Sequence, residues 1–265
     1  MSKTAEAGHG HEGHTYGDKH GTVIVTGASR GIGAAIATEL GEAGYGVAVN
    51  YSSHEEPAEE VAAAIRAHGG RASAIHADVS VPDEVAELFE RAERELGPVT
   101  ALVNNAGTTG APTPFDLQEP AKLSQLLAIN VLGPMVCARH AVEKMATSHG
   151  GRGGSIVNIA SVAARTGGLP GLVPYAATKG AMVSFSRALS NEVASEGIRV
   201  NSVSPGIIDT EMSADLDSPE TKEAVAHSPI GRLGRPEEIA DTVTWLISPA
   251  ASFVTGSDIT VSGGR

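Results

Sequence analysis

The chain has 265 residues, of which 41% are hydrophobic and 19% are charged, a composition typical of a globular protein and unlike that of a disordered chain. Its formal net charge is −12, which opposes binding to the phosphate backbone of a nucleic acid. No apolar run approaches the about 18 residues that a membrane-spanning helix needs. We therefore expect neither a nucleic-acid partner nor a membrane partner.

Cys137 is the only cysteine, so no disulfide can form within the chain. A lone cysteine is typical of proteins from a reducing compartment, and a cytoplasmic location is expected. The first twenty residues lack the apolar segment of a secretory signal, which agrees with that expectation.

Four of the ten histidines lie in the first twenty residues, where they alternate with glycines: His9, His11, His14 and His20. Such a tract can bind metal weakly, but no cysteine or aspartate accompanies the histidines at the spacing of a structural zinc site. We therefore predict a disordered tail over residues 1–20 and no metal site.

From Gly21 onward, strand-like and helix-like patterns alternate along the chain. Short apolar runs predict strands over Thr22–Thr26, Gly46–Asn50, Arg71–Ala77, Val99–Val103, Ser155–Ala160, Ile198–Val203 and Asp258–Val261. Amphipathic stretches predict helices over Gly31–Ala43, Glu55–Ala67, Pro82–Leu96, Tyr175–Glu196 and Pro236–Ser248, and two more within Pro120–Met145.

The strand patterns are continuous apolar runs, as in a parallel sheet that is buried on both faces. Repeated strand–helix–strand units imply right-handed crossovers. The sequence therefore predicts one α/β domain over residues 21–265, a Rossmann-type, doubly wound parallel sheet of about seven strands. The long irregular region Pro205–Pro236 contains a predicted short helix near Pro219–Ala226, and residues around 207–235 are expected to form a substrate lid.

Three glycines, Gly27, Gly31 and Gly33, stand where the first strand meets the first helix. Glycines allow a tight turn, close approach of a pyrophosphate, and packing of the helix on the sheet. The free N–H groups and the dipole of the helix N-terminus favour phosphate groups. A plain strand–helix turn is the alternative, but three glycines followed by further strand–helix–strand units favour nucleotide binding.

The spacing Gly27-x-x-x-Gly31-x-Gly33 resembles that of the short-chain dehydrogenase/reductase family, and the resemblance extends from Thr22 to Gly264. Further motifs of that family follow in order: Asn104-Asn105-Ala106-Gly107, Asn130, Ser161, Tyr175-x-x-x-Lys179 and Pro205-Gly206. Each motif alone is common, but the ordered set is specific. The resemblance, in particular to bacterial glucose-type dehydrogenases and 3-oxoacyl-carrier-protein reductases, implies a nicotinamide-dependent enzyme.

The resemblance also implies which residues bind the cofactor. They are Gly27, Ser29, Arg30, Gly31, Ile32, Gly33, Asn50, Tyr51, Ser52, Asp78, Val79, Asn105, Ala106, Gly107, Tyr175, Lys179, Pro205, Gly206, Ile208 and Thr210. Among them, Asp78 and Val79 match the segment that flanks the adenine, where a carboxylate can accept from the exocyclic amine.

The cofactor is expected to be NADP(H) rather than NAD(H). NAD-preferring relatives usually carry an acidic residue at the end of the second strand, whereas residues 49–53 contain no carboxylate. Similar enzymes direct an arginine at the 2′-phosphate, and Arg30 stands in the glycine loop. A solvated charge at the helix end is the alternative interpretation of Arg30.

Tyr175 and Lys179 are four positions apart, so they share one face of a helix. We expect the ammonium group to lower the pKa of Tyr175, which would let the tyrosine act as acid and base near neutral pH. The resemblance implies that Ser161 hydrogen-bonds the substrate oxygen and stabilises charge that develops there. A partly buried tyrosine beside a surface lysine is the alternative, and the other motifs argue against it.

Asn130 stands four positions before Pro134. In a helix, the Asn130 carbonyl would accept from the N–H of residue 134, which proline lacks. We expect a free carbonyl that binds water, and the resemblance implies a proton relay from this water toward Lys179. A proline kink that shapes packing alone is the other interpretation.

The expected substrate wall is small and mixed in character, and includes Val162, Ala163, Thr166, Leu169, Leu172, Ile207 and Met212. Residues 191–196 are acidic, and Glu196 stands where carrier-protein reductases often have a basic residue beside the site mouth. We therefore expect a small ketone and secondary alcohol as the substrate pair. A 3-oxoacyl-carrier-protein reductase is the alternative. A non-catalytic NADP-sensing protein is a further alternative, although such proteins usually lose part of the Ser161, Tyr175 and Lys179 set.

Assembly into a homotetramer is expected, with a dimer as the second choice. The predicted helix Tyr175–Glu196 carries a wide apolar stripe, and the run Ser252–Val261 ends beside an edge strand. Both features favour cover by a second copy of the chain.

Overall fold

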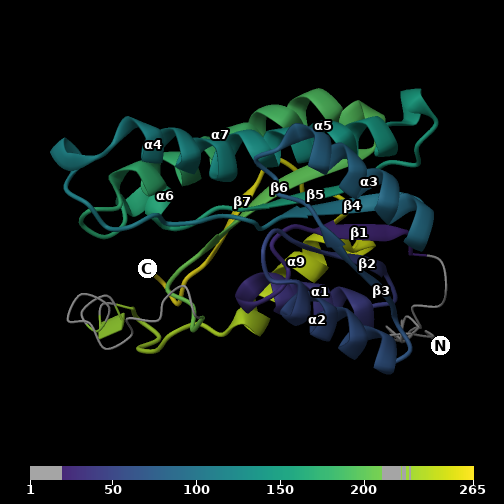
Figure 1. Cartoon of the computed structure of the whole chain (residues 1–265), viewed down its shortest axis with the longest axis horizontal. Coiled ribbons are helices and arrows are strands. Elements are labelled where there is room, and N and C mark those ends of the chain that lie inside the picture. The colour runs from purple at the N-terminus through teal and green to yellow at the C-terminus, as the bar shows by residue number, and fades with distance from the viewer. Residues whose placement is uncertain (1–19, 211–221, 223–224, 227) are drawn as a thin grey trace, which may run out of the picture.

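Parallel pairing organises the strands of the computed structural model, which describes residues 20–210, 222, 225–226 and 228–265 (Figure 1). The strands are β1 (Thr22–Val25), β2 (Gly46–Tyr51), β3 (Arg71–His76), β4 (Val99–Asn104), β5 (Gly154–Ile159), β6 (Ile198–Pro205) and β7 (Asp258–Val261). They lie in the order β3-β2-β1-β4-β5-β6-β7, and every neighbouring pair is parallel. The strand order reverses between β1 and β4, and ligands of such sheets bind outside the carboxyl ends of the strands at that point.

Helices cover both faces of the sheet. They are α1 (Gly31–Glu42), α2 (Glu55–Ala67), α3 (Pro82–Leu96), α4 (Pro120–Leu127), α5 (Gly133–Met145), α6 (Ala163–Thr166), α7 (Val173–Val193) and α9 (Pro236–Ile247). Helices α1, α2 and α9 lie on one face, and α3, α5 and α7 lie on the other (Figure 1). The predicted Rossmann-type, doubly wound fold is confirmed by this arrangement.

Short 3₁₀ turns join several of these elements: η1 (Phe115–Leu117), η3 (Thr147–His149), η4 (Ala194–Glu196) and η6 (Pro249–Ala251). A π turn, η2 (Ala128–Leu132), lies between α4 and α5. Residues 120–145 are long and apolar enough to cross a membrane by length and composition alone. In this fold, however, the α5 residues Cys137, Ala141 and Met145 are completely buried against the sheet.

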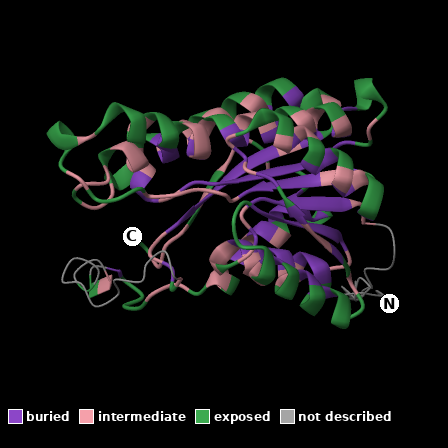
Figure 2. Ribbon diagram, in the orientation of Figure 1, coloured by how far each residue is buried: buried purple, intermediate pink, exposed green. Residues whose placement is uncertain are grey.

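The central strands are apolar on both faces because each face has its own core. Val23 and Val25 of β1 pack with α1 and α9, whereas Ile24 between them packs with α3 and α5. All three side chains are inaccessible to solvent, and the strands form the buried centre of the molecule in Figure 2. Burial on both faces explains the continuous apolar runs in the sequence.

Some predictions fall on residues outside the described ranges. These are the tail over residues 1–20, apart from His20, most of the short helix predicted near Pro219–Ala226, part of the lid, and Met212.

Candidate active site

A cavity of about 810 Å³ opens at the carboxyl ends of the strands. Every residue predicted from the sequence to bind the cofactor contributes to its wall, from the glycine loop after β1 to Thr210 after β6. Ser161, Tyr175 and Lys179 line the same cavity. The sheet thus brings together segments that lie more than 180 positions apart in the chain.

The glycine loop has the geometry of a cradle that side chains would fill. Gly27 and Gly31 have φ angles of +61° and +55°, a region that residues other than glycine rarely adopt. A Cβ at Gly33 would collide with the Gly27 carbonyl oxygen and with the Asn105 side chain. The loop therefore leaves main-chain N–H groups at the start of α1 open to a phosphate, which fits the pyrophosphate of a dinucleotide.

Polar side chains fix this loop against the end of β4. The Asn105 amide group donates to the carbonyl oxygens of Thr26 and Gly27, at 2.9 and 3.0 Å. The Thr26 hydroxyl oxygen accepts from the main-chain N–H groups of Asn105 and Ala106, both at 3.0 Å. Asn105 was predicted as a cofactor contact, and its side chain positions the loop. The role of Thr26 was missed, because a buried threonine before a glycine has no distinctive sequence signal.

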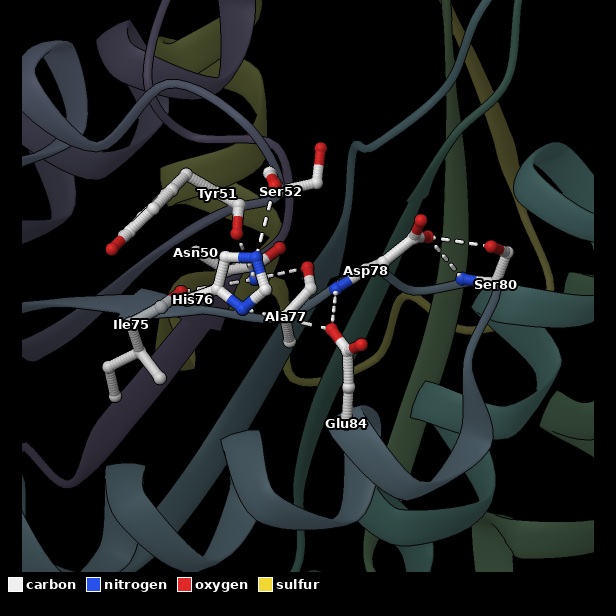
Figure 3. Close-up of polar contacts among 9 residues, drawn as sticks. All are labelled: Asn50, Tyr51, Ser52, Ile75, His76, Ala77, Asp78, Ser80 and Glu84. Atoms are coloured by element: carbon white, nitrogen blue, oxygen red, sulfur yellow. Dashed lines mark hydrogen bonds and ion pairs between the residues drawn. The ribbon is translucent and has the colours of Figure 1, made fainter.

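Asn50 holds three segments together behind the cavity. Its side-chain oxygen accepts from the Gly27 N–H at 3.2 Å. Its amide group donates to the carbonyl oxygens of Ile75 and Ala77 at 3.2 and 3.0 Å, as Figure 3 shows. The side chain is almost completely buried. Asn50 thus shapes the cavity wall by joining the glycine loop to β2 and β3.

Arg30 occupies the N-cap position of α1 and is exposed at the cavity wall. Ser52 and Ser53 line the same cavity, at the end of β2. No carboxylate lies on the β2 end between Val49 and Ser53. The wall there offers a cation and hydroxyl groups to a ligand.

Ser161, Tyr175 and Lys179 meet where β5 faces the first turns of α7. Ser161 and Tyr175 both line the cavity at this point. The Lys179 Nζ lies 5.7 Å from the centre of the Tyr175 ring and donates to the Ile159 carbonyl oxygen at 2.8 Å. Helix α7 begins at Val173, two residues earlier than predicted, with Pro174 in its first turn, where proline is well tolerated.

Burial sets the protonation of this group. It raises the pKa of Tyr175, against the smaller and opposing effect of the Ser161 hydroxyl. Burial also lowers the pKa of Lys179 to about 8. The expectation that Lys179 lowers the pKa of Tyr175 is wrong for this structure, because desolvation of the tyrosine outweighs the other effects on it.

Asn130 lies behind the cavity wall, inside the π turn. Its side-chain oxygen accepts from the Thr108 N–H at 2.9 Å, and its amide group donates to the Thr108 carbonyl and the Thr178 hydroxyl at 2.8 and 3.1 Å. The Gly133 N–H bonds to the Ala128 carbonyl, five positions back. A π turn thus occupies the place where the sequence predicted a free Asn130 carbonyl or a proline kink between two helical stretches.

Glu196 lies away from the cavity, which corrects one sequence-based argument. It follows the carboxyl end of α7, whereas Tyr175 is at the other end, about 30 Å along a helix of this length. The Glu196 carboxylate accepts from the Ser148 N–H at 2.8 Å and from the Thr147 hydroxyl at 3.0 Å. The acidic segment over residues 191–196 is therefore not beside the mouth of this chain's own cavity, because α7 separates the two.

The predicted substrate residues Val162, Ala163, Thr166, Leu169, Leu172 and Ile207 all contribute to the cavity wall. Thr178, which the sequence analysis missed, supports the site from α7. Its hydroxyl donates to the Tyr175 carbonyl at 2.7 Å and accepts from Asn130. The sequence could have indicated this role, because Thr178 stands between Tyr175 and Lys179.

Comparison with known proteins agrees with this geometry. The family model described as enoyl-(acyl carrier protein) reductase matches residues 27–265. The uncharacterised oxidoreductase YgfF of Escherichia coli (strain K12) is 43% identical over 243 residues, which cover 91% of this chain and 98% of that protein. The 3-oxoacyl-[acyl-carrier-protein] reductase FabG of Staphylococcus aureus (strain Mu50 / ATCC 700699) is 37% identical over 92% of this chain and 97% of that protein.

Two solved structures extend the comparison. A 7α-hydroxysteroid dehydrogenase in complex with NADH and 7-oxo glycochenodeoxycholic acid has a TM-score of 0.87 and 35% identity, covering 93% of this chain and 94% of that one. A short-chain dehydrogenase from Burkholderia cenocepacia J2315 in complex with NADP has a TM-score of 0.85 and 32% identity, covering 91% and 96%.

The fold and the site define an oxidoreductase that uses a nicotinamide cofactor. The chain belongs to the short-chain dehydrogenase/reductase family, as its sequence predicted, and members of this family act on small-molecule substrates.

Proposed function

We propose that this protein is an NADP(H)-dependent oxidoreductase that interconverts a small ketone and a secondary alcohol, with Tyr175 as the acid and base. The observation that carries the proposal is the meeting of Ser161, Tyr175 and Lys179 in one cavity with the glycine loop. When bound, the nicotinamide cofactor supplies or accepts the hydride.

Side chains of the protein donate and accept the proton of the reaction. The raised pKa of Tyr175 keeps its phenol protonated near neutral pH, which is the form that donates to a carbonyl oxygen. Ser161 lines the cavity together with Tyr175, and its hydroxyl would donate to the substrate oxygen. Lys179 holds its ammonium group beside the tyrosine ring, and Asn130 with its π turn would support a water relay behind it.

The preference for NADP(H) rests on charge at the cavity wall. Arg30 is exposed there, and the end of β2 has no carboxylate that would hold a ribose hydroxyl and repel a phosphate. An arginine–phosphate contact is charge-assisted and stronger than a neutral hydrogen bond. The related structures differ in their bound cofactor, since the Burkholderia cenocepacia dehydrogenase was solved with NADP and the 7α-hydroxysteroid dehydrogenase with NADH.

Reduction of a 3-oxoacyl group on a carrier protein is the second candidate. The relationship to the Staphylococcus aureus reductase favours it. The net charge of −12 disfavours docking of an acidic carrier. Glu196 does not add to this argument, because it lies away from the mouth of the chain's own cavity.

A turnover assay tests the proposal. Purified protein with NADPH is offered a panel of free ketones and, separately, a 3-oxoacyl carrier protein, and loss of NADPH absorbance is followed. We expect oxidation of NADPH with at least one free ketone. Turnover with the carrier substrate alone would favour the second candidate, and no turnover with either would refute the proposed activity.

A further inference from the structure

The carboxylate of Glu84, in the first turn of α3, contacts both the last residue of β3 and the segment that follows this strand. Its Oε2 accepts from the main-chain N–H of Asp78 at 2.7 Å. The same oxygen lies 3.7 Å from Nδ1 of His76. Figure 3 shows Glu84 beneath both groups, with its carboxylate between His76 and the Asp78 main chain.

His76 lies between this carboxylate and the segment after β2. Its Nε2 lies 3.1 Å from the Ser52 carbonyl oxygen, and because a carbonyl oxygen only accepts, Nε2 must carry a proton. The ring also packs edge-on against Tyr51, with ring centres 5.5 Å apart. His76 therefore ties the segment after β2 to the end of β3, on the side that faces Glu84.

Asp78 is oriented by a second set of bonds. One carboxylate oxygen, Oδ1, accepts from both the N–H and the hydroxyl of Ser80, at 2.8 and 2.7 Å. Asp78 and Ser52 both line the cavity, whereas Glu84 and His76 stand behind them. A displacement of the Asp78 or Ser52 main chain would therefore change the cavity wall directly.

We propose that Glu84 is a positioning residue for the adenosine half of the cofactor, and that it acts on Asp78 directly and on Ser52 through His76. This inference rests on the proposed function, in which the 2′-phosphate lies near Arg30 and the end of β2, and on the resemblance by which Asp78 flanks the adenine. Asp78 would meet the adenine amine, and Ser52 would lie near the 2′ position of the ribose. One carboxylate thus sets the spacing of both contacts.

Asp83 provides a matched control for Glu84. Both carboxylates stand in the first turn of α3, so both interact with the helix dipole in the same way. Asp83 is exposed and, within the part of the chain that the structure describes, makes no side-chain hydrogen bond to the Asp78 segment. A difference between the two variants therefore reports the bond to Asp78 rather than the charge at the helix end.

The experiment measures binding of NADPH and of 2′,5′-ADP, which contains only the adenosine half, to wild type, E84A, E84Q and D83A. E84A should raise both dissociation constants about tenfold, the effect of losing one charge-assisted hydrogen bond. E84Q retains an oxygen that accepts from the Asp78 N–H, so it should restore most of the affinity. D83A should bind both ligands as wild type does.

Melting temperatures separate positioning from general stability. A merely structural role would lower the melting temperature in E84A and E84Q alike and leave their affinities equal, which would overturn the proposal. Equal affinities in E84A and D83A would also overturn it. If E84A does not fold, H76A takes its place with H68A as control, because His68 is an exposed histidine at the far end of α2. H76A should then weaken the binding of 2′,5′-ADP, whereas H68A should leave it unchanged. Equal affinities of these two variants for 2′,5′-ADP would contradict the inference. Failure of the wild type to bind NADPH would instead count against the proposed function.

Discussion

At the scale of single side chains, the pH dependence of the rate in each direction follows from how burial sets the protonation of Tyr175. Burial raises its pKa, so the phenol that donates a proton to a ketone predominates at neutral pH. Oxidation of an alcohol needs the phenolate, which forms only as the pH rises. We therefore expect the rate of alcohol oxidation to increase with pH up to the alkaline range, while ketone reduction does not. Initial rates in both directions between neutral and alkaline pH check this, and an oxidation rate that falls with pH would contradict it.

Lys179 should make the stability of the protein depend on pH. Its pKa is about 8 in the folded chain and about 10.4 when unfolded, so the unfolded chain binds more protons between these values. The free energy of unfolding therefore rises with pH in that window. K179M should be more stable than wild type near pH 7 by up to roughly 3 kcal/mol, and the difference should shrink toward pH 10. Urea denaturation across this range measures it, with the exposed Lys122 as K122M for control.

A K179M protein that gains no stability at neutral pH would show that Lys179 is not held against a desolvation penalty. The same variant should lose both turnover and cofactor affinity, since by resemblance Lys179 also contacts the nicotinamide ribose.

Arg30 should control the choice of cofactor. R30A removes a charge-assisted contact to the 2′-phosphate, so the dissociation constant for NADPH should rise about tenfold or more, while that for NADH stays within a few fold. Fluorescence titration of both nucleotides measures the difference. The exposed Arg152 outside the cavity provides the control R152A. A wild-type protein that binds NADH more tightly than NADPH would refute the assignment.

Some properties of the site residues could be predicted from the sequence, and others depend on the fold. The residue types and order of Ser161, Tyr175 and Lys179 were sufficient to predict that they meet. The pKa of Tyr175 was predicted in the wrong direction, because burial depends on what the fold packs around the ring. Glu196 was assigned to the site mouth for a similar reason, since a sequence position does not say at which end of α7 the cavity opens.

At the scale of elements, the π turn η2 is expected to support proton transfer, and Pro134 is the residue through which this can be tested. Pro134 lies in the first turn of α5, and P134A would supply the N–H that a regular helix needs at the Asn130 carbonyl. We expect an equal or slightly higher melting temperature, because proline in a first turn costs little, together with slower turnover. P120A in the first turn of α4 is the matched control. A P134A enzyme with an unchanged pH–rate profile would leave the π turn as packing alone.

The helices whose bounds could be predicted are those in which the hydrophobic periodicity and the residues at the helix ends indicate the same bounds. The bounds of α2 (Glu55–Ala67) and α3 (Pro82–Leu96) coincide with their predictions, because turn residues or a first-turn proline mark their ends. The π turn was not predicted, since a glycine–proline pair within an apolar stretch is equally compatible with a kink. The anchoring role of Glu84 was not predicted either, because it depends on a contact six positions back along a loop.

At the scale of the whole molecule, exposed apolar side chains point to assembly. Phe253 is fully exposed in the single chain, and Trp245 on α9 is also exposed. Phe115 in η1 and Leu132 in η2 are exposed as well, and η2 leads into α5, which covers the opposite face of the sheet from α9. Exposed apolar side chains on two faces of the molecule favour the expected tetramer, since one contact face would suffice for a dimer.

Light scattering at micromolar concentration tests the assembly. We expect about four times the chain mass of 26.9 kDa and smaller species for F253D, because a buried carboxylate would disfavour the contact. Deletion of residues 1–20 should change neither the number of chains in the assembly nor the turnover. A wild-type mass near that of one chain would exclude the tetramer and the dimer.

The central claim is that Tyr175 transfers the proton in an NADPH-dependent reduction. The most direct measurement compares wild type and Y175F for ketone-dependent NADPH oxidation, with NADPH affinity measured in parallel. We predict that Y175F loses the activity by several orders of magnitude while its affinity for NADPH stays within a few fold, because the hydroxyl supplies the proton but little cofactor contact. Y175F turnover close to that of wild type would contradict the mechanism.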